Sequence, residues 1–288
     1  MSTAPAEWTG ARYVALGSSF ASAPGLGTPV PGSPPEAGRT DVNYPHLLAQ
    51  QLQLSLTDVT SSGATTADVL WRSQYGQAPQ ADALAADTDL VTVTIGGNDI
   101  GYASSLAMAG LPAAAYLRQR PSLDMLRALA PAAQNRRIAL LPAAMASVGQ
   151  LIRRRSPNAV VLFVEYLTVL PADPHIRVAG MKPAQAAAGR ELAVHLALAT
   201  EAGAAATGCS VVRVAKASLD HYAGSEDPWT VGGFIPTEGG PLPFHPNQAG
   251  HEAVAQMIIS HLHRPADEQH GRLHGSGGGA GIDWADGK

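Results

Sequence analysis

The chain has 288 residues, of which 45% are apolar and 15% are charged, and its formal net charge is -4 with a pI near 6.2. Such a chain is long enough to bury a sizeable core as one large domain. Its weakly acidic balance offers no electrostatic reason to expect a nucleic-acid partner. The single cysteine, Cys209, excludes an intrachain disulfide and a cysteine-rich metal site, and we expect neither a metal nor a cofactor.

The first twelve residues lack the basic stretch followed by an apolar stretch that marks a secretory signal. No apolar run is long enough to cross a bilayer, so no integral membrane contact is expected. These features predict a cytoplasmic location, with leaderless export as the alternative.

Strand-like and helix-like segments alternate along the chain. The expected strands are the run that starts at Tyr13 and the segments 55–59, 89–95, 159–165 and 210–214. The expected helices are 41–54, 66–72, 134–155, 183–206 and 247–263. This alternation predicts an α/β fold, a three-layer α/β/α sandwich around a five-stranded parallel sheet with the flavodoxin-like strand order 2-1-3-4-5. It divides the chain into a flexible N-terminus (1–11), one domain (12–264) and a disordered Gly-rich tail (265–288).

The first apolar run, 13–16, stops at Gly17-Ser18-Ser19. A strand that ends this way delivers a polar side chain to the carboxyl edge of the sheet, where open α/β sheets bind their ligands. If a helix begins there, its N-terminus favours developing negative charge beside Ser19. Taken alone, the stretch is more typical of serines that cap a helix, because Gly-Ser-Ser is a common turn composition. Whether Ser19 is a nucleophile depends on whether the chain also supplies oxyanion donors and a base.

Two other strand ends carry residues suited to the same chemistry. The second predicted strand is followed by Gly63, and the third by Gly96-Gly97-Asn98-Asp99. In the expected strand order these segments flank Ser19 on either side. Attack of a hydroxyl on an ester carbonyl creates an oxyanion that requires two or three preorganised donors. The backbone N–H groups of Ser19 and Gly63 and the amide of Asn98 are the candidates for this oxyanion hole.

A serine nucleophile needs a base within hydrogen-bond reach. Among ten histidines, His245 lies in the loop before the final helix, where it can fold back over the sheet edge. His251 falls inside that helix and is expected on its surface. The other histidines are scattered without the spacing of a metal site. His245 is therefore the candidate base.

These residues together resemble the GDSL or SGNH hydrolase family. The similarity rests on four blocks that follow the family's order and spread over the chain from Tyr13 to about His263, namely 15–20, Gly63, 96–99 and 245–247. The resemblance implies a three-layer α/β/α hydrolase fold in which Ser19 is the nucleophile and His245 the general base. It also implies an oxyanion hole of Ser19, Gly63 and Asn98, with Asp99 fixing its loop.

One departure from the family pattern concerns the acid of the catalytic triad. Members usually carry an Asp three residues before the histidine, and this chain has Leu242 there. Some relatives work as a Ser-His dyad, in which a backbone carbonyl accepts the imidazole N–H. We expect that carbonyl to come from the segment 238–242, with the side chains of Asp227 or Glu238 as substitutes for the missing acid.

The function implied by the resemblance is a serine hydrolase that cleaves carboxylic esters by two-step acyl transfer, with a small-molecule ester as substrate. Two alternatives stay open. The missing acid would suit a catalytically silent relative that binds an acylated or glycosylated ligand. The fold class also admits a nucleotide-binding protein, although Gly25-Leu26-Gly27 lacks the third glycine of a dinucleotide fingerprint.

Overall fold

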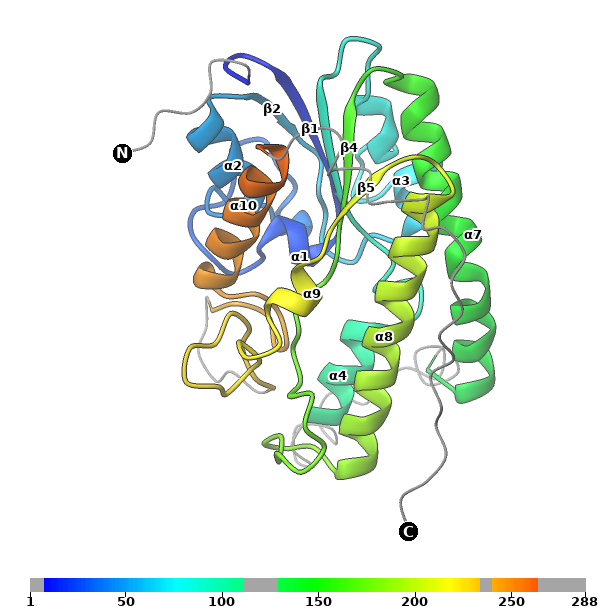
Figure 1. Ribbon diagram of the computed structural model, residues 1–288, viewed down its shortest axis with the longest axis vertical. Coiled ribbons are helices and arrows are strands. Elements are labelled where there is room, and N and C mark those ends of the chain that lie inside the picture. The colour runs from blue at the N-terminus through cyan, green and yellow to red at the C-terminus, as the bar shows by residue number, and fades with distance from the viewer. Residues whose placement is uncertain (1–7, 111–128, 234–239, 264–288) are drawn as a thin grey trace, which may run out of the picture.

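The computed structural model describes residues 8–110, 129–233 and 240–263. Its centre is an all-parallel sheet in the order β2-β1-β3-β4-β5, which confirms the predicted flavodoxin-like topology (Figure 1). The strands are β1 (Arg12–Gly17), β2 (Ser55–Asp58), β3 (Leu90–Thr94), β4 (Val160–Val164) and β5 (Ser210–Val212). The carboxyl ends of these strands form one edge of the sheet.

Both faces of the sheet are buried, as the apolar character of its central strands indicates. Every residue of β3 is buried, and β1 is buried from Tyr13 to Gly17. Alternate residues of β1 point to opposite faces and join different cores. Tyr13 belongs to one hydrophobic cluster, whereas Val14 belongs to the other. The sheet therefore separates two cores.

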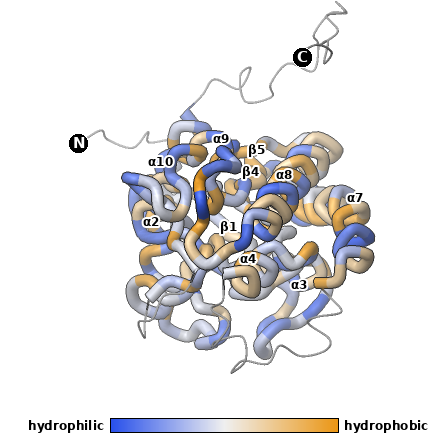
Figure 2. Tube along the Cα trace, turned by 90° about the horizontal axis from the view of Figure 1, so that it is seen from below, coloured by the Kyte–Doolittle hydropathy of each residue, from blue (hydrophilic) through white to orange (hydrophobic). Residues whose placement is uncertain are grey.

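Helices cover each face. One layer contains α2 (Tyr44–Leu52) and α10 (Gln248–Leu262). The opposite layer contains α3 (Thr66–Leu70), α7 (Pro131–Arg155) and α8 (Pro183–Ala205). Figures 1 and 2 show α7 and α8 on the other side of the sheet from α2 and α10. The predicted three-layer α/β/α sandwich is confirmed.

Local capping sets the helix starts and shifts two predicted boundaries. Helix α2 begins at Tyr44 because the Asn43 side chain accepts a hydrogen bond from the His46 N–H at 2.9 Å. Asp41, the cap expected from the sequence, instead accepts from the Thr28 N–H at 2.8 Å. Helix α7 begins at Pro131, ahead of the expected start at residue 134, because proline suits the first helical turn.

Shorter elements complete the carboxyl edge of the sheet. They are α1 (Ser19–Ser22), α4 (Tyr102–Gly110) and α9 (Val214–Ala217), with 3-10 turns η1 (Pro35–Ala37) and η2 (Gln80–Ala83). The fifth strand ends at Val212, two residues before its expected end, because the chain turns into α9. Across the described ranges, no helix combines the length and apolarity needed to cross a membrane.

Residues 8–11 of the predicted flexible N-terminus are among those that the structure describes. Residues 8–11 form a turn against the end of α2, where the Gly10 N–H donates to the Gln53 carbonyl at 2.8 Å. Residues 1–7 of the expected N-terminal arm and residues 265–288 of the expected tail lie outside the described ranges.

Candidate active site

Ser19 and His245 meet at the carboxyl edge of the sheet. Ser19 is the first residue of α1, directly after β1, and its hydroxyl Oγ lies 2.8 Å from His245 Nε2. Both residues are buried, with 4% and 6% of their surfaces exposed. The fold thus brings the two residues, 226 positions apart in the sequence, into direct hydrogen-bond contact.

The orientation of His245 is set by a backbone carbonyl. Its Nδ1 lies 2.8 Å from the Pro243 carbonyl oxygen, a group that only accepts, so Nδ1 carries the proton. Nε2 then presents a lone pair to the Ser19 hydroxyl. Phe244, which lies between Pro243 and His245 in the sequence, is fully buried and has a left-handed φ of 57°, which turns the chain back on itself. The expected segment 238–242 was wrong by one residue, because this turn brings the nearer carbonyl to the ring.

Asp227, one of the two side chains considered as substitutes for the acid, contacts a different histidine. The Asp227 carboxylate is 3.3 Å from His221 Nδ1, and its backbone carbonyl also contacts that nitrogen at 2.7 Å. Glu238 lies outside the described residues. Within the part of the chain that the structure describes, no carboxylate contacts His245. The ring is held by a neutral carbonyl.

Three strand ends are tied together around Ser19. The Ser18 N–H donates to the Thr94 carbonyl at the end of β3, and the Ser61 N–H donates to the Gly17 carbonyl. Gly17 permits this close approach, because a Cβ there would lie 2.7 Å from the Thr94 carbonyl oxygen. These bonds place the segments carrying Ser19, Gly63 and Asn98 side by side, as the strand order predicted.

The expected oxyanion donors differ in whether they are already hydrogen-bonded. The backbone N–H groups of Ser19 and Gly63 make no hydrogen bond to any described residue. Gly63 is exposed and has a φ of 78°, a conformation that glycine adopts without strain. The Asn98 Nδ2 donates to the Ala64 carbonyl at 2.8 Å, which fixes its amide and leaves its second N–H available.

Asp99 connects the Asn98 loop to the start of α3. Its carboxylate accepts from the Thr66 N–H at 3.0 Å and from the Thr66 hydroxyl. Burial raises the pKa of Asp99, while the hydrogen bonds from Thr66 act against that shift. These contacts fit the loop-fixing position that the family resemblance implied for Asp99.

Tyr166 is a site residue that the sequence patterns did not single out. Its hydroxyl lies 2.8 Å from the Ser18 Oγ and accepts from the Gly97 N–H at 3.2 Å. Its ring packs against Phe20 at 4.5 Å between centroids, and Phe20 lies 4.9 Å from the His245 ring. Its place just beyond β4, at the same edge as the other site residues, is the signal that would have identified it.

His251 corrects another prediction. It was expected on the helix surface, but it is fully buried, and its Nδ1 accepts from the Tyr44 N–H at 3.2 Å. The reason is that α10 packs against α2 with this side facing inward. Burial lowers the pKa of His251 to about 3, with the nearby His245 adding to the shift.

The environment of His245 predicts an unusual pH dependence. Burial lowers its pKa to about 4, and the Pro243 carbonyl opposes that shift only in part. A base must be unprotonated, so kcat/KM should persist well below pH 6.5 and fall with an apparent pKa near 4. The check is a pH profile of kcat/KM with a neutral ester; an acidic limb near 6.5 in folded protein would contradict this prediction.

Thermal unfolding measured over the same pH range controls for loss of structure. The pKa values of His245 and His251 are both depressed by folding, so the unfolded chain binds more protons between pH 6.5 and about 4. Stability should therefore fall as the pH is lowered through this window. Rates are to be compared only where the unfolding temperature lies above the assay temperature.

Comparison with known proteins places this geometry in a family. Residues 15–253 match the model of the GDSL-like Lipase/Acylhydrolase family. Lipase 2 of Streptomyces coelicolor is 50% identical over 98 residues, which cover 33% of this chain and 32% of that protein. The matched regions span 32% to 52% of the length of the curated relatives.

Two solved structures resemble the whole domain. Phospholipase A1 from Streptomyces albidoflavus NA297 superposes with a TM-score of 0.69 at 27% identity, covering 88% of this chain and 99% of that one. The extracellular lipase of Streptomyces rimosus superposes with a TM-score of 0.65 at 26% identity and the same coverage. The family model spans most of the chain, including Ser19, Gly63, Asn98 and His245, and this chain belongs to the GDSL-like Lipase/Acylhydrolase family.

Proposed function

We propose that this protein is a carboxylic ester hydrolase that works by acyl transfer through a dyad of Ser19 and His245. The observation that carries the proposal is the buried contact of 2.8 Å between Ser19 Oγ and His245 Nε2. The proton on Nδ1, directed at the Pro243 carbonyl, leaves Nε2 free to act as the base. A serine placed in this way gains the nucleophilicity that an isolated hydroxyl lacks.

The reaction proceeds in two halves. His245 Nε2 takes the Ser19 proton as Oγ attacks the ester carbonyl carbon, and the imidazolium then protonates the leaving alcohol. Water, deprotonated by the same nitrogen, then attacks the acyl carbon; the bond between Ser19 Oγ and the acyl group breaks, the imidazolium returns the proton to Oγ, and the carboxylic acid leaves. In both halves the oxyanion accepts hydrogen bonds from the N–H groups of Ser19 and Gly63 and from the Asn98 amide.

The carbonyl of Pro243 performs part of the role of a triad acid. It holds the imidazole in the correct tautomer, but it is neutral and stabilises the imidazolium less than a carboxylate would. This difference agrees with the depressed pKa of His245. A dyad of this kind is therefore expected to operate with a weaker but acid-tolerant base.

Two observations support a substrate class, namely the names of the relatives and an apolar cavity beside Tyr166. The relatives described above are named as lipases and a phospholipase A1, which favours esters with an apolar acyl group. A cavity of about 430 Å³ with a mainly apolar lining has Tyr166 in its wall, whereas Ser19 and His245 are not among its lining residues. Its walls include Tyr102, Tyr166, Leu170, Leu196 and Leu219. A pocket of this size suits a small organic group.

The test combines covalent labelling with a substrate series. We expect a fluorophosphonate to label wild-type protein once, at Ser19, and p-nitrophenyl esters from acetate upward to be hydrolysed with a chain-length optimum. Ser19→Ala is the matched control and should show neither reaction. Folded wild-type protein that takes no label and cleaves no ester would overturn the proposal and favour a silent ligand-binding relative.

A further inference from the structure

The proposed oxyanion hole requires one orientation of the peptide between Ser62 and Gly63, in which the Gly63 N–H points at the oxyanion. In a trans peptide the carbonyl and the N–H point in opposite directions, and the described chain contains no cis peptide bond. If the Gly63 N–H is directed at the oxyanion, the Ser62 carbonyl must point away from it. Whatever holds that carbonyl therefore sets the direction of the Gly63 donor.

Two side chains from one hairpin hold the Ser62 carbonyl. Gln74 Nε2 donates to it at 2.9 Å, and the Tyr75 hydroxyl donates at 3.4 Å. A Cβ placed on Gly63 would lie 3.6 Å from both of these donor atoms, so the hairpin lies directly against the glycine. The N–H groups of Ser62 and Ala64 on either side donate to backbone carbonyls, but glycine restricts its backbone least, so loss of the two side-chain bonds would leave this peptide freer to rotate.

Gln74 is itself held in place. It exchanges two backbone hydrogen bonds with Gln77, at 3.1 and 2.9 Å, around a two-residue turn. Tyr75 and Gly76 in that turn have φ angles of 50° and 73°, and two positive φ angles are typical of a type I′ hairpin. Gln77 Oε1 also accepts from Arg39 Nη2, and Arg39 donates to the Thr60 carbonyl. The hairpin is thus tied to the loop that precedes Gly63.

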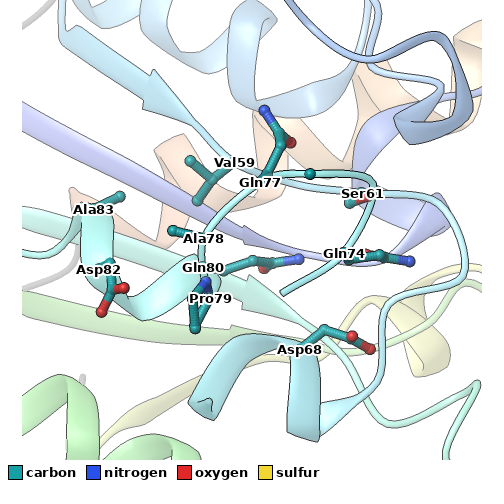
Figure 3. A pocket seen from close by; sticks show the side chains of 11 residues that line it. Val59, Ser61, Asp68, Gln74, Gln77, Ala78, Pro79, Gln80, Asp82 and Ala83 are labelled. Atoms are coloured by element: carbon teal, nitrogen blue, oxygen red, sulfur yellow. The ribbon is translucent and has the colours of Figure 1, made fainter. Parts of the chain in front are cut away.

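The Gln74 side chain has only this one hydrogen bond within the described residues. Its Oε1 is buried without a partner there, although it lines a pocket of about 420 Å³ between the hairpin, α3 and η2. Figure 3 shows Gln74 at this pocket beside Ser61, with Gln77 and Gln80 on the same loop. Gln80 differs, because its amide bonds both the N–H and the carbonyl of Gly17. Among the residues that the structure describes, the amide of Gln74 has the Ser62 carbonyl as its sole hydrogen-bond partner.

We infer that Gln74 is a positioning residue, which directs the Gly63 N–H at the oxyanion by holding the Ser62 carbonyl, with Tyr75 in a secondary role. The inference rests on the proposed function, since it assumes that an oxyanion forms beside Gly63. Gln74 acts through the backbone of its neighbour, so its loss should weaken transition-state stabilisation and leave substrate binding almost unchanged.

The experiment replaces Gln74 with residues of similar size that cannot donate, in Gln74→Leu and Gln74→Met. Removing an oxyanion donor costs about 10²- to 10³-fold in kcat, and a freed peptide still presents its N–H part of the time, so we expect a loss of about 10-fold. KM for p-nitrophenyl acetate should stay within about twofold, as expected for an interaction made only in the transition state. Affinity for a trifluoromethyl ketone, which forms a tetrahedral adduct, should fall in parallel with kcat.

Gln77→Glu is the matched control, because it alters the same hairpin, its carboxylate can still accept from Arg39, and the Ser62 contact is left intact; its kcat should stay near wild type. Tyr75→Phe should lower kcat less than either Gln74 variant. Folded Gln74 variants with wild-type kcat, or with a raised KM alone, would overturn the inference. So would a loss that Gln77→Glu reproduces. If wild-type protein neither takes the fluorophosphonate label nor cleaves esters, the proposed function fails first, and this inference fails with it.

Discussion

Replacing His245 with alanine is expected to lower kcat for ester hydrolysis by about 10⁴-fold or more, with the fold intact. The base is then absent, and the Ser19 hydroxyl remains almost fully protonated at neutral pH. Ser19→Ala should lose a similar factor. Because the two groups act as a unit through the contact of 2.8 Å, the double variant should be no slower than either single variant. Steady-state kinetics on one p-nitrophenyl ester, with equal amounts of folded protein, provide the measurement.

A histidine outside the dyad serves as the control for this series. His221 stacks on Trp229 with ring centroids 3.8 Å apart, and its Nδ1 contacts the Asp227 carbonyl rather than Ser19. His221→Ala should therefore retain wild-type kcat. Additive losses in the double variant, or a His245→Ala rate within tenfold of wild type, would show that the two residues do not act as a catalytic pair.

The second large effect is expected at Asn98. Asn98→Ala removes the only side-chain donor of the proposed oxyanion hole and should lower kcat by about 10²- to 10³-fold with little change in KM. Asn98→Asp keeps the size of the side chain but has no N–H, so it should lose at least as much. The same substitutions remove the bond from Asn98 Nδ2 to the Ala64 carbonyl, so the position of the loop has to be controlled for.

Gln134→Ala provides that control. The Gln134 amide donates to the Ile100 carbonyl, two residues beyond Asn98, at 2.9 Å. Its loss should loosen the same loop without removing a donor from the site, and kcat should change only slightly. An Asn98→Ala variant with near wild-type kcat would remove Asn98 from the oxyanion hole, as would a Gln134→Ala variant that loses as much.

The sheet was predictable because its information is local. A parallel strand covered on both faces needs an unbroken apolar run, and the segments around Val14 and Val91 have that pattern. The order of the strands then places their carboxyl ends in a row. From that order alone, the segments that carry Ser19, Gly63 and Asn98 could be predicted to be neighbours, without knowledge of any side-chain contact. Helix limits were less accurate, because a single cap such as Asn43 in place of Asp41 moves a boundary by several residues.

The candidate reacting residues could also be chosen from the chain, because a nucleophile, a base and oxyanion donors are specific residue types at strand ends. The partners that orient them were decided by tertiary packing. The Pro243 carbonyl reaches His245 because Phe244, between them, is buried with a left-handed φ. The Phe244 ring packs so closely on Gly110 of α4 that a Cβ there would lie 2.7 Å from the ring. Gln74 bonds to a backbone carbonyl 12 residues away, and Tyr166 bonds to groups 69 and 148 residues away, with no pattern of spacing to reveal either contact. Sequence periodicity specifies which elements form and where they end, whereas contacts between distant loops depend on how those elements pack.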